Sequence, residues 1–193
     1  RMHARVRSAA VLGVEAYLVD VEVDLANGLP SFATVGLPQA AVKEGRERVT
    51  AALANSGFAV PLKRTTINLA PAAIPKSGSA FDLPVALGIL VASGQLPEGA
   101  LRNALCFGEL GLEGDVRPVR GALPMALAAR AAGFGDLLLP ADNVPEASVV
   151  EGIAVRGART LAEVCGHLTG SATLAAQGSR LASLVGPPEA DPV

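Results

Sequence analysis

Residues 75–90 (PKSGSAFDLPVALGIL) constrain the fold most strongly, because a turn of small residues opens directly into an almost wholly apolar segment. Ser79 and Asp82 supply oxygen acceptors that favour the start of a helix, and Pro84 is tolerated only in a first helical turn. The pattern therefore predicts a buried helix that begins near Ser79 or Ala80. The Ser79 hydroxyl at this strand-to-helix turn is either a helix cap or a nucleophile served by open backbone N–H groups.

Alternating hydrophobicity and turn residues divide the rest of the chain into short elements. We expect strands over residues 4–12, 14–25, 32–35, 65–69, 105–109, 116–119, 137–139 and 153–155, and helices over residues 39–56, 79–93, 122–132, 144–150 and 161–168. The strands at 105–109 and 116–119 form a hairpin in this prediction. The alternation of helices and strands in the second half predicts an α/β layer packed on an earlier, more antiparallel sheet.

The length of 193 residues fits one domain with a substantial core. We predict a folded domain over residues 1–170 and a linker over residues 171–193, where Ser, Ala, Gly and Pro replace the apolar pattern. Half of the residues are hydrophobic but only 3% are aromatic, so Ala, Val and Leu must build the core. The longest apolar stretch is too short to span a membrane and the chain starts without an apolar secretion segment, so we expect a cytoplasmic protein without membrane contact.

The charged and metal-binding residue types exclude several functions. A net charge of −2 provides no overall electrostatic attraction for nucleic acid, so any DNA contact must come from a local patch or from another subunit. Cys106 and Cys165 lack metal-ligand spacing and are interpreted as buried thiols. Asp20, Glu22 and Asp24 alternate with valines, which indicates a solvated sheet face, with a cation site as the alternative interpretation. We predict no metal site.

Several basic residues are candidates for contact with DNA phosphates. In the helix predicted over residues 39–56, a solvated face is the default interpretation of the cations, and contact with phosphate or a neighbouring subunit is the functional alternative. Glu44 and Arg48 are spaced for mutual support on that helix. The candidate cations in the whole chain are Arg46, Arg48, Lys63, Arg64, Lys76, Arg117 and Arg120.

Residues 75–82 resemble the serine loop of the Lon protease domain, which reads Pro-Lys-Asp-Gly-Pro-Ser-Ala-Gly. In an ungapped alignment the nucleophile position falls on Ala80, and Ser79 lies one place early. Residues 120–125 (RGALPM) match the segment around the Lon lysine and place Leu123 at the lysine position. An aliphatic side chain cannot accept the proton of a hydroxyl. The resemblance therefore implies a Lon-like scaffold whose catalytic pair has been lost.

Five motifs in order resemble the N-terminal, ChlI-type domain of the ComM/YifB family of magnesium-chelatase-like AAA+ proteins. They are residues 31–38 (SFATVGLP), 44–49 (EGRERV), 67–71 (INLAP), 78–84 (GSAFDLP) and 117–121 (RPVRG). The resemblance implies an α/β (α+β) fold of the Lon protease-like, ribosomal protein S5 domain 2-like type, with helices packed on a mixed sheet. It also implies a hexameric parent that acts on DNA in natural transformation and branch migration, with ATP and Mg bound by a separate AAA+ module.

The sequence itself contains no Gly-x-x-x-x-Gly-Lys-Ser/Thr motif, so we expect no nucleotide cofactor in this chain. Three functions remain open. The first is a non-catalytic domain that serves assembly and makes local, sequence-independent DNA contacts with its own AAA+ module as a partner. The second is an oligomerisation scaffold without DNA contact. The third is a residual serine peptidase that uses Ser79 with Lys76 as its base, although a base from the same loop is geometrically doubtful.

Overall fold

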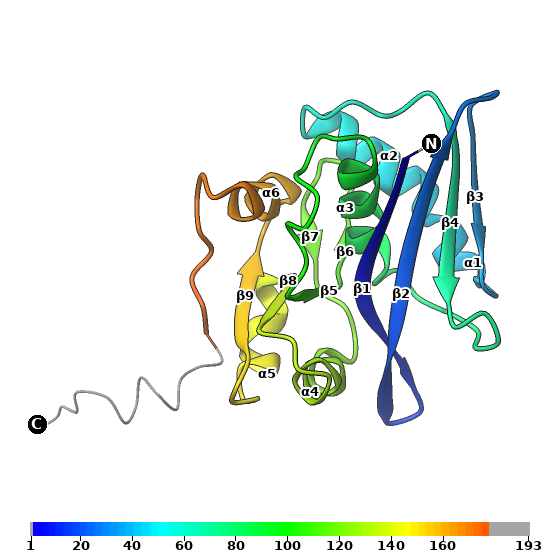
Figure 1. Ribbon diagram of the computed structural model, residues 1–193. Coiled ribbons are helices and arrows are strands. Elements are labelled where there is room, and N and C mark those ends of the chain that lie inside the picture. Colours follow the sequence, from blue (N-terminus) through cyan, green and yellow to red (C-terminus); the bar gives the residue numbers. More distant parts are fainter. Residues whose placement is uncertain (1, 178–193) are drawn as a thin grey trace, which may run out of the picture.

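The computed structural model describes residues 2–177 and contains one mixed sheet with helices on both faces (Figure 1). The strands are β1 (Met2–Leu12), β2 (Glu15–Ala26), β3 (Ser31–Val35), β4 (Arg64–Ala70), β5 (Ala104–Cys106), β6 (Glu109–Leu110), β7 (Val116–Arg117), β8 (Asp136–Pro140) and β9 (Ala154–Ala158). The helices are α1 (Ala40–Lys43), α2 (Gly45–Asn55), α3 (Asp82–Ala92), α4 (Ala122–Ala131), the 3-10 helix η1 (Ala141–Asn143), α5 (Val144–Ala147) and α6 (Leu161–Thr169). This architecture confirms the α/β class.

Seven strands form the main sheet in the order β3-β4-β2-β1-β5-β8-β9, and β6 pairs with β7 separately. In the N-terminal half of the sheet (β1–β4), β2 pairs antiparallel with β1 and β4, and β3 lies parallel to β4. In the C-terminal half (β5, β8 and β9), all pairs are parallel. One parallel pair, Arg7 with Leu105, joins the halves. The prediction that the second half forms a separate α/β layer packed on the earlier sheet is therefore wrong. Strand β1 pairs with β5, so both halves belong to one sheet.

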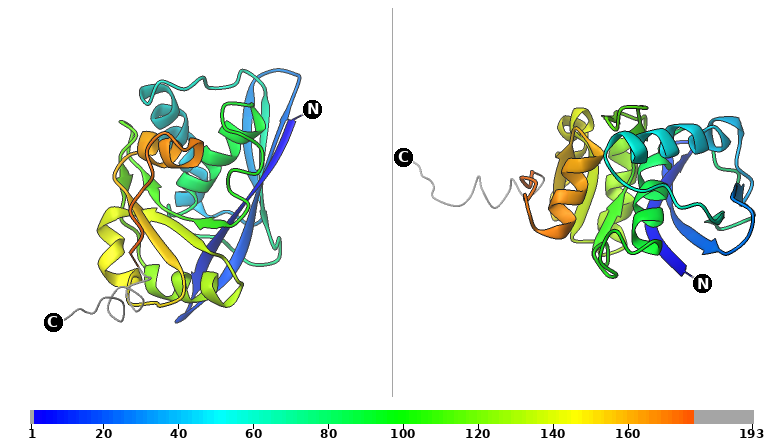
Figure 2. Two further views of the ribbon diagram at one scale, coloured as in Figure 1. Left: turned by 60° about the vertical axis from the view of Figure 1, so that its left-hand side comes forward. Right: turned by 90° about the horizontal axis from the view of Figure 1, so that it is seen from above.

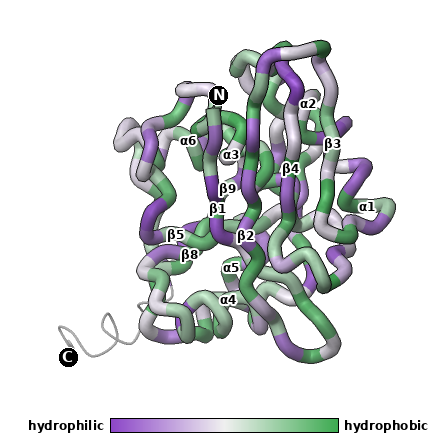
Figure 3. The backbone as a smooth tube through the Cα atoms, turned by 45° about the vertical axis from the view of Figure 1, so that its right-hand side comes forward, coloured by the Kyte–Doolittle hydropathy of each residue, from purple (hydrophilic) through white to green (hydrophobic). Residues whose placement is uncertain are grey.

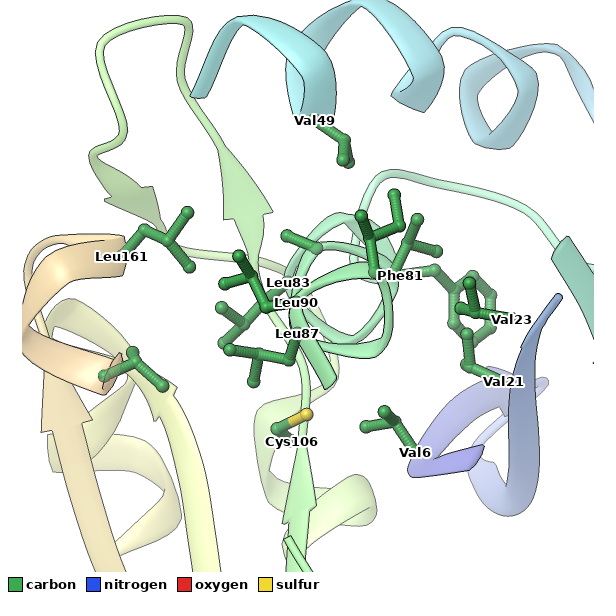
Figure 4. Close-up of a cluster of buried hydrophobic side chains, with 14 of the residues drawn as sticks. Val6, Val21, Val23, Val49, Phe81, Leu83, Leu87, Leu90, Cys106 and Leu161 are labelled. Atoms are coloured by element: carbon green, nitrogen blue, oxygen red, sulfur yellow. The ribbon is translucent and has the colours of Figure 1, made fainter. Parts of the chain in front are cut away.

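Helix α3 lies in the larger of two cores, between α2 and strands β1 and β2 (Figure 4). Its buried side chains include Leu83, Leu87 and Leu90. In Figure 4 these leucines lie on the side of α3 toward Leu161 and Cys106, and Val21 and Val23 of the sheet lie on its other side. Gly88 allows this close packing, because a Cβ atom there would lie 2.6 Å from Cγ2 of Val23. The helix can therefore be apolar all round, as expected of a helix buried on every side.

The second core lies on the opposite face of the sheet, where α4 packs on the hairpin end of β1 and β2 and α5 packs on β9 (Figure 2). Helix α6 contributes Leu161 and Val164 to the first core. The C-terminal half is thus covered on both faces. The N-terminal half is covered along its length on one face. Its other face is covered by α4 only at the hairpin end of β1 and β2 and elsewhere carries polar residues that alternate with the buried ones (Figure 3).

Two local predictions were wrong in detail. Helix α3 begins at Asp82 rather than near Ser79 or Ala80, because the residues before it form a turn in which the Asp82 N–H donates to the carbonyl of Ser79 at 3.2 Å. The predicted hairpin between residues 105–109 and 116–119 is reduced to the short pair β6–β7. The chain leaves the sheet after β5, where the Gly108 N–H donates to the Ala80 carbonyl at 2.8 Å.

Residues 171–177 continue along β9 after α6 ends. The N–H of Gln177 donates to the carbonyl of Val155 at 2.7 Å, and Arg156 donates to the carbonyl of Leu174 at 2.7 Å. The remainder of the predicted linker, residues 178–193, lies outside the described residues. In the described part of the chain, no helix combines the length and the apolar character needed to cross a membrane.

Candidate functional site

A cleft of about 650 Å³ lies beside β1. Its walls are formed by residues 9–11 of β1, by residues 77–81 before α3 and by residues 118–120 after β7. Glu109 and Met125 also line it. The volume lies within the range of about 300–1,000 Å³ that is typical of ligand pockets. The cleft thus joins the serine loop and the segment that resembles the region around the Lon lysine.

Ser79 lies in this cleft, and its partner is a carboxylate. Its hydroxyl donates to Oε1 of Glu109 at 2.5 Å. Glu109 is positioned by β6, whose next residue, Leu110, donates its N–H to Oδ2 of Asp82 at 3.1 Å. The sequence predicted that Ser79 is a helix cap or a nucleophile. In the structure its hydroxyl bonds the side chain of Glu109, which lies thirty residues further along the chain.

Lys76 points away from Ser79. Its side chain is fully buried, and its Nζ donates to the carbonyls of Gly36 (2.9 Å) and Pro71. Burial lowers the pKa of this amine. Lys76 therefore holds two loops together and is withdrawn both as the base for Ser79 and as a DNA contact, since its ammonium group cannot reach solvent.

The two positions aligned with the Lon dyad carry no reactive group. Ala80 and Leu123 are partly buried and pack against the second core. The backbone N–H of Leu123 donates to Oε2 of Glu146 at 3.2 Å, which fixes the first turn of α4 beside α5. The alignment and the geometry thus bring these positions to the same region of the molecule without a hydroxyl or an amine on either.

This scaffold matches a known family. Residues 21–143 match the family model described as subunit ChlI of Mg-chelatase, which is more than half of the 193 residues. This chain belongs to the ChlI family. The match spans β2 to η1 and therefore includes the serine loop, Glu109 and most of the cleft.

The chain is also similar to several curated proteins. Competence protein ComM of Haemophilus influenzae is 46% identical over 171 residues, which cover 89% of this chain and 33% of ComM. YifB of Escherichia coli is 42% identical over 169 residues, which cover 88% of this chain and 33% of YifB. An uncharacterized protein of Mycobacterium tuberculosis is 48% identical over 171 residues, 89% of this chain and 34% of its own length. These matches confirm the resemblance to ComM and YifB, and the chain spans about a third of the length of these relatives.

Arg48 of the ChlI chain is engaged inside the protein. Its guanidinium donates to both carboxylate oxygens of Asp82, at 2.6 and 3.2 Å, and to the carbonyl of Ala41 at 2.7 Å. Burial raises the pKa of Asp82 to about 6, although the bonds from Arg48 and from the Leu110 N–H act in the opposite direction. Arg48 joins α2 to the start of α3 and is therefore withdrawn as a candidate DNA contact.

Three of the seven predicted cations lie on α2 and around the start of β4, and we call Arg46, Lys63 and Arg64 together the β4 basic patch. Arg46 and Lys63 line a shallow hollow of about 170 Å³ between α2 and the start of β4. The Lys63 ammonium donates to Oδ1 of Asn27 at 2.8 Å, and Arg64 follows it on the surface. The side chain of Arg46 is 56% exposed. Charges from two elements that are separate in the sequence therefore share one surface.

The other two predicted cations belong to the region of the cleft. Arg120 is exposed and lines the cleft, whereas Arg117 is paired with Asp115 at 2.7 Å on β7. The cleft and the hollow lined by Arg46 and Lys63 share no lining residue, so the two are separate surfaces.

The acidic row of β2 lies on the uncovered face of the N-terminal half. Asp20 is paired with Arg7 at 2.6 Å, and Glu22 accepts a hydrogen bond from Asn68 at 2.8 Å. Residues 2–177 hold no group of three or more His, Cys, Asp or Glu side chains arranged for a metal ion. The row thus forms part of a polar sheet face with mixed charges.

Sequence reasoning missed the roles of Glu109 and Asp82. Asp82 is a carboxylate inside an apolar segment, and such a residue usually has a buried partner. That signal pointed to an ion pair as well as to a helix cap. Glu109 stands next to a glycine in a region without periodicity, and no local pattern in the sequence connects it with Ser79.

Proposed function

We propose that this chain is a non-catalytic domain of a ComM-type AAA+ protein that acts in DNA processing. The observation that carries the non-catalytic assignment is the combination of Ala80 and Leu123 at the dyad positions with a Lys76 amine that bonds two carbonyls. The Ser-Lys mechanism of the Lon domain needs a lysine amine in hydrogen-bond reach of the hydroxyl. Here Lys76 is turned elsewhere, and the Ser79 hydroxyl bonds the Glu109 carboxylate instead. The sequence similarity to ComM supports the assignment to this kind of protein.

We further propose that the β4 basic patch makes local contacts with DNA. Arg46 and Lys63 line one hollow, and Arg64 is exposed next to Lys63 in the chain. Such a group binds DNA phosphates without reading the base sequence. Its affinity for DNA falls steeply as the salt concentration rises. The hexameric assembly, the ATP and the Mg belong, in this proposal, to the AAA+ module of the parent protein.

The DNA contact is tested by fluorescence anisotropy of labelled single- and double-stranded DNA over a salt series. We expect salt-dependent binding by the wild-type chain and its loss in the triple variant R46E/K63E/R64E. Arg130→Glu is the matched control, because Arg130 is exposed on α4 at the opposite end of the molecule (Figure 1). Affinity that does not change between low and moderate salt, or an equal loss in the control, contradicts the DNA contact.

A scaffold without DNA contact is the second candidate, and exposed leucines favour it. Leu29 and Leu62 are 88% and 81% exposed beside the β4 basic patch. An assembly role predicts that Leu29→Ser and Leu62→Ser lower the mass in solution, measured by light scattering. It also predicts that the triple charge reversal leaves DNA affinity unchanged.

The non-catalytic assignment has its own test. A serine-reactive fluorophosphonate probe should fail to label the wild-type chain. Labelling of the wild type that Ser79→Ala removes would instead establish a nucleophilic serine in the cleft.

A further inference from the structure

Strand β1 has an edge that no strand of residues 2–177 pairs with over much of its length. Along one side, β1 pairs with β2 from Met2 to Leu12. Along the other side, it pairs with β5 only at Arg7. Residues 8–12 therefore keep one row of backbone N–H and C=O groups outside any ladder, which we call the free edge of β1. Such an edge is a template for another extended chain.

The free edge exists because the neighbouring chain turns away. After Cys106, the Phe107 N–H donates to the carbonyl of Leu138 and the Gly108 N–H donates to that of Ala80. The polypeptide that would have continued beside β1 is thereby drawn to β8 and to the loop before α3. Figure 1 shows β1 continuing past the short β5 toward its hairpin with β2.

The free edge faces the cleft, which provides room for an extended backbone. Ala9, Ala10 and Val11 line the cleft, and the loops at 77–81 and 118–120 stand opposite. Several lining side chains are very small, so main-chain atoms of a ligand can approach the strand. The cleft is larger than a single side chain would need, and its walls are mostly apolar.

Charge at the cleft indicates what kind of chain fits. The Glu109 carboxylate already accepts the Ser79 hydroxyl, and a phosphate placed there would be repelled. Arg120 is exposed at the other wall and makes no hydrogen bond or ion pair with any residue of 2–177. The backbone at Gly121 lies against Val11, since a Cβ there would come within 2.3 Å of Val11 Cγ2. Arg120 thus stands at the hairpin end of the free edge.

We propose that the cleft binds an extended peptide segment of a partner protein, which adds as a strand to residues 8–12 of β1. Main-chain hydrogen bonds to the free edge supply the affinity, in the manner of strand addition to an exposed sheet edge. Small apolar side chains of the peptide pack against Val119 and Met125, and an acidic side chain pairs with Arg120. This peptide contact is separate from the DNA contact proposed for the β4 basic patch.

The proposal is tested with a fluorescein-labelled Ala-Val-Ala-Val-Asp peptide and its counterpart ending in Lys. NMR shift perturbation in the 15N-labelled chain should fall on residues 8–12 and 118–120 at peptide concentrations up to about 1 mM. The strand β3 is the internal control, because it lies at one edge of the sheet and also has an edge outside the ladder. Perturbation of residues 31–35 instead, or of neither region, overturns the proposal.

Two further measurements separate strand addition from unspecific apolar binding. Two peptides are N-methylated, one at its odd-numbered and one at its even-numbered residues. Only one of them should lose binding, because successive N–H groups of a strand point to opposite sides. An equal effect on both peptides contradicts strand addition. Arg120→Glu should weaken the Asp peptide about three- to tenfold relative to the Lys peptide.

Matched controls keep these outcomes specific. Arg117→Glu changes a nearby exposed arginine that is already paired with Asp115, and it should leave the preference between the two peptides unchanged. The triple variant R46E/K63E/R64E should bind peptide like the wild type. If that variant loses DNA and keeps peptide, both proposals stand, and each can fail without the other.

Discussion

The two halves of the sheet differ in how much of their two faces is buried by helices. In the C-terminal half, Leu137, Leu138 and Leu139 are all buried, because helices cover both faces of the parallel strands. In the N-terminal half, buried and polar residues alternate along β2, because helices cover only one face beyond the hairpin end that α4 contacts. The difference shows where a partner can bind: the C-terminal half is closed, whereas the open surfaces lie on the N-terminal half and at its junction with β5.

The two halves should differ most in the loss of unfolding free energy when a core leucine of one half and a polar residue on the open face of the other are replaced by alanine. Leu138→Ala should lower the free energy of unfolding by about 2–5 kcal/mol, because it leaves a cavity in a region buried on both sides. Leu138 is 1% exposed. Asn68→Ala removes only the hydrogen bond to Glu22 and should cost less than about 1 kcal/mol. Urea unfolding of both variants measures these costs, and similar values would contradict the difference between the halves.

The buried ion pair connects the first core to the cleft. Asp82→Ala should lower the free energy of unfolding by about 2–3 kcal/mol, because the Arg48 guanidinium loses its partner in a largely buried position. Asp142→Ala, which removes a 3.9 Å surface pair with Arg159, serves as the control and should cost at most about 0.5 kcal/mol. Equal costs in thermal unfolding would show that the buried pair contributes no more than a surface pair.

The contact of α3 with the N-terminal strands leaves no room for a methyl group. Gly88→Ala should destabilise the fold by about 1–2 kcal/mol, since the new Cβ would lie 2.6 Å from Cγ2 of Val23. The double variant with Val23→Ala should recover part of this loss. A stabilised single variant would mean that the helix moves away from β2 at little cost.

The smallest effect concerns pH and the segment beside β9. Nδ1 of His167 accepts the N–H of Leu174 at 3.1 Å, and burial, with Arg156 nearby, lowers the pKa of this histidine. The unfolded chain therefore binds this proton first, so stability falls as pH drops through the unfolded value of about 6.5. Hydrogen exchange at residues 172–177 should accelerate between pH 7.5 and about pH 5.5 relative to the rest of the chain. His167→Gln should remove the pH dependence of that difference.

Local patterns in the sequence predicted most elements of the fold. The alternation of valines and carboxylates identified β2, the apolar run after Pro84 identified α3, and the three leucines before Pro140 identified β8. In each case the signal comes from neighbouring residues, whose periodicity reports which side of one element is buried. The resemblance to the Lon motifs, rather than periodicity, placed Ala80 and Leu123 at the positions aligned with a catalytic pair.

Only the tertiary structure decided which charges are available and where the sheet stays open. The sequence grouped Arg48 and Lys76 with the surface cations, but Asp82 binds the first and the carbonyls of Gly36 and Pro71 bind the second. The free edge of β1 depends on where the chain leaves β5. Burial of a charge and pairing of a strand edge are contacts between residues far apart in the sequence, and no local periodicity records them.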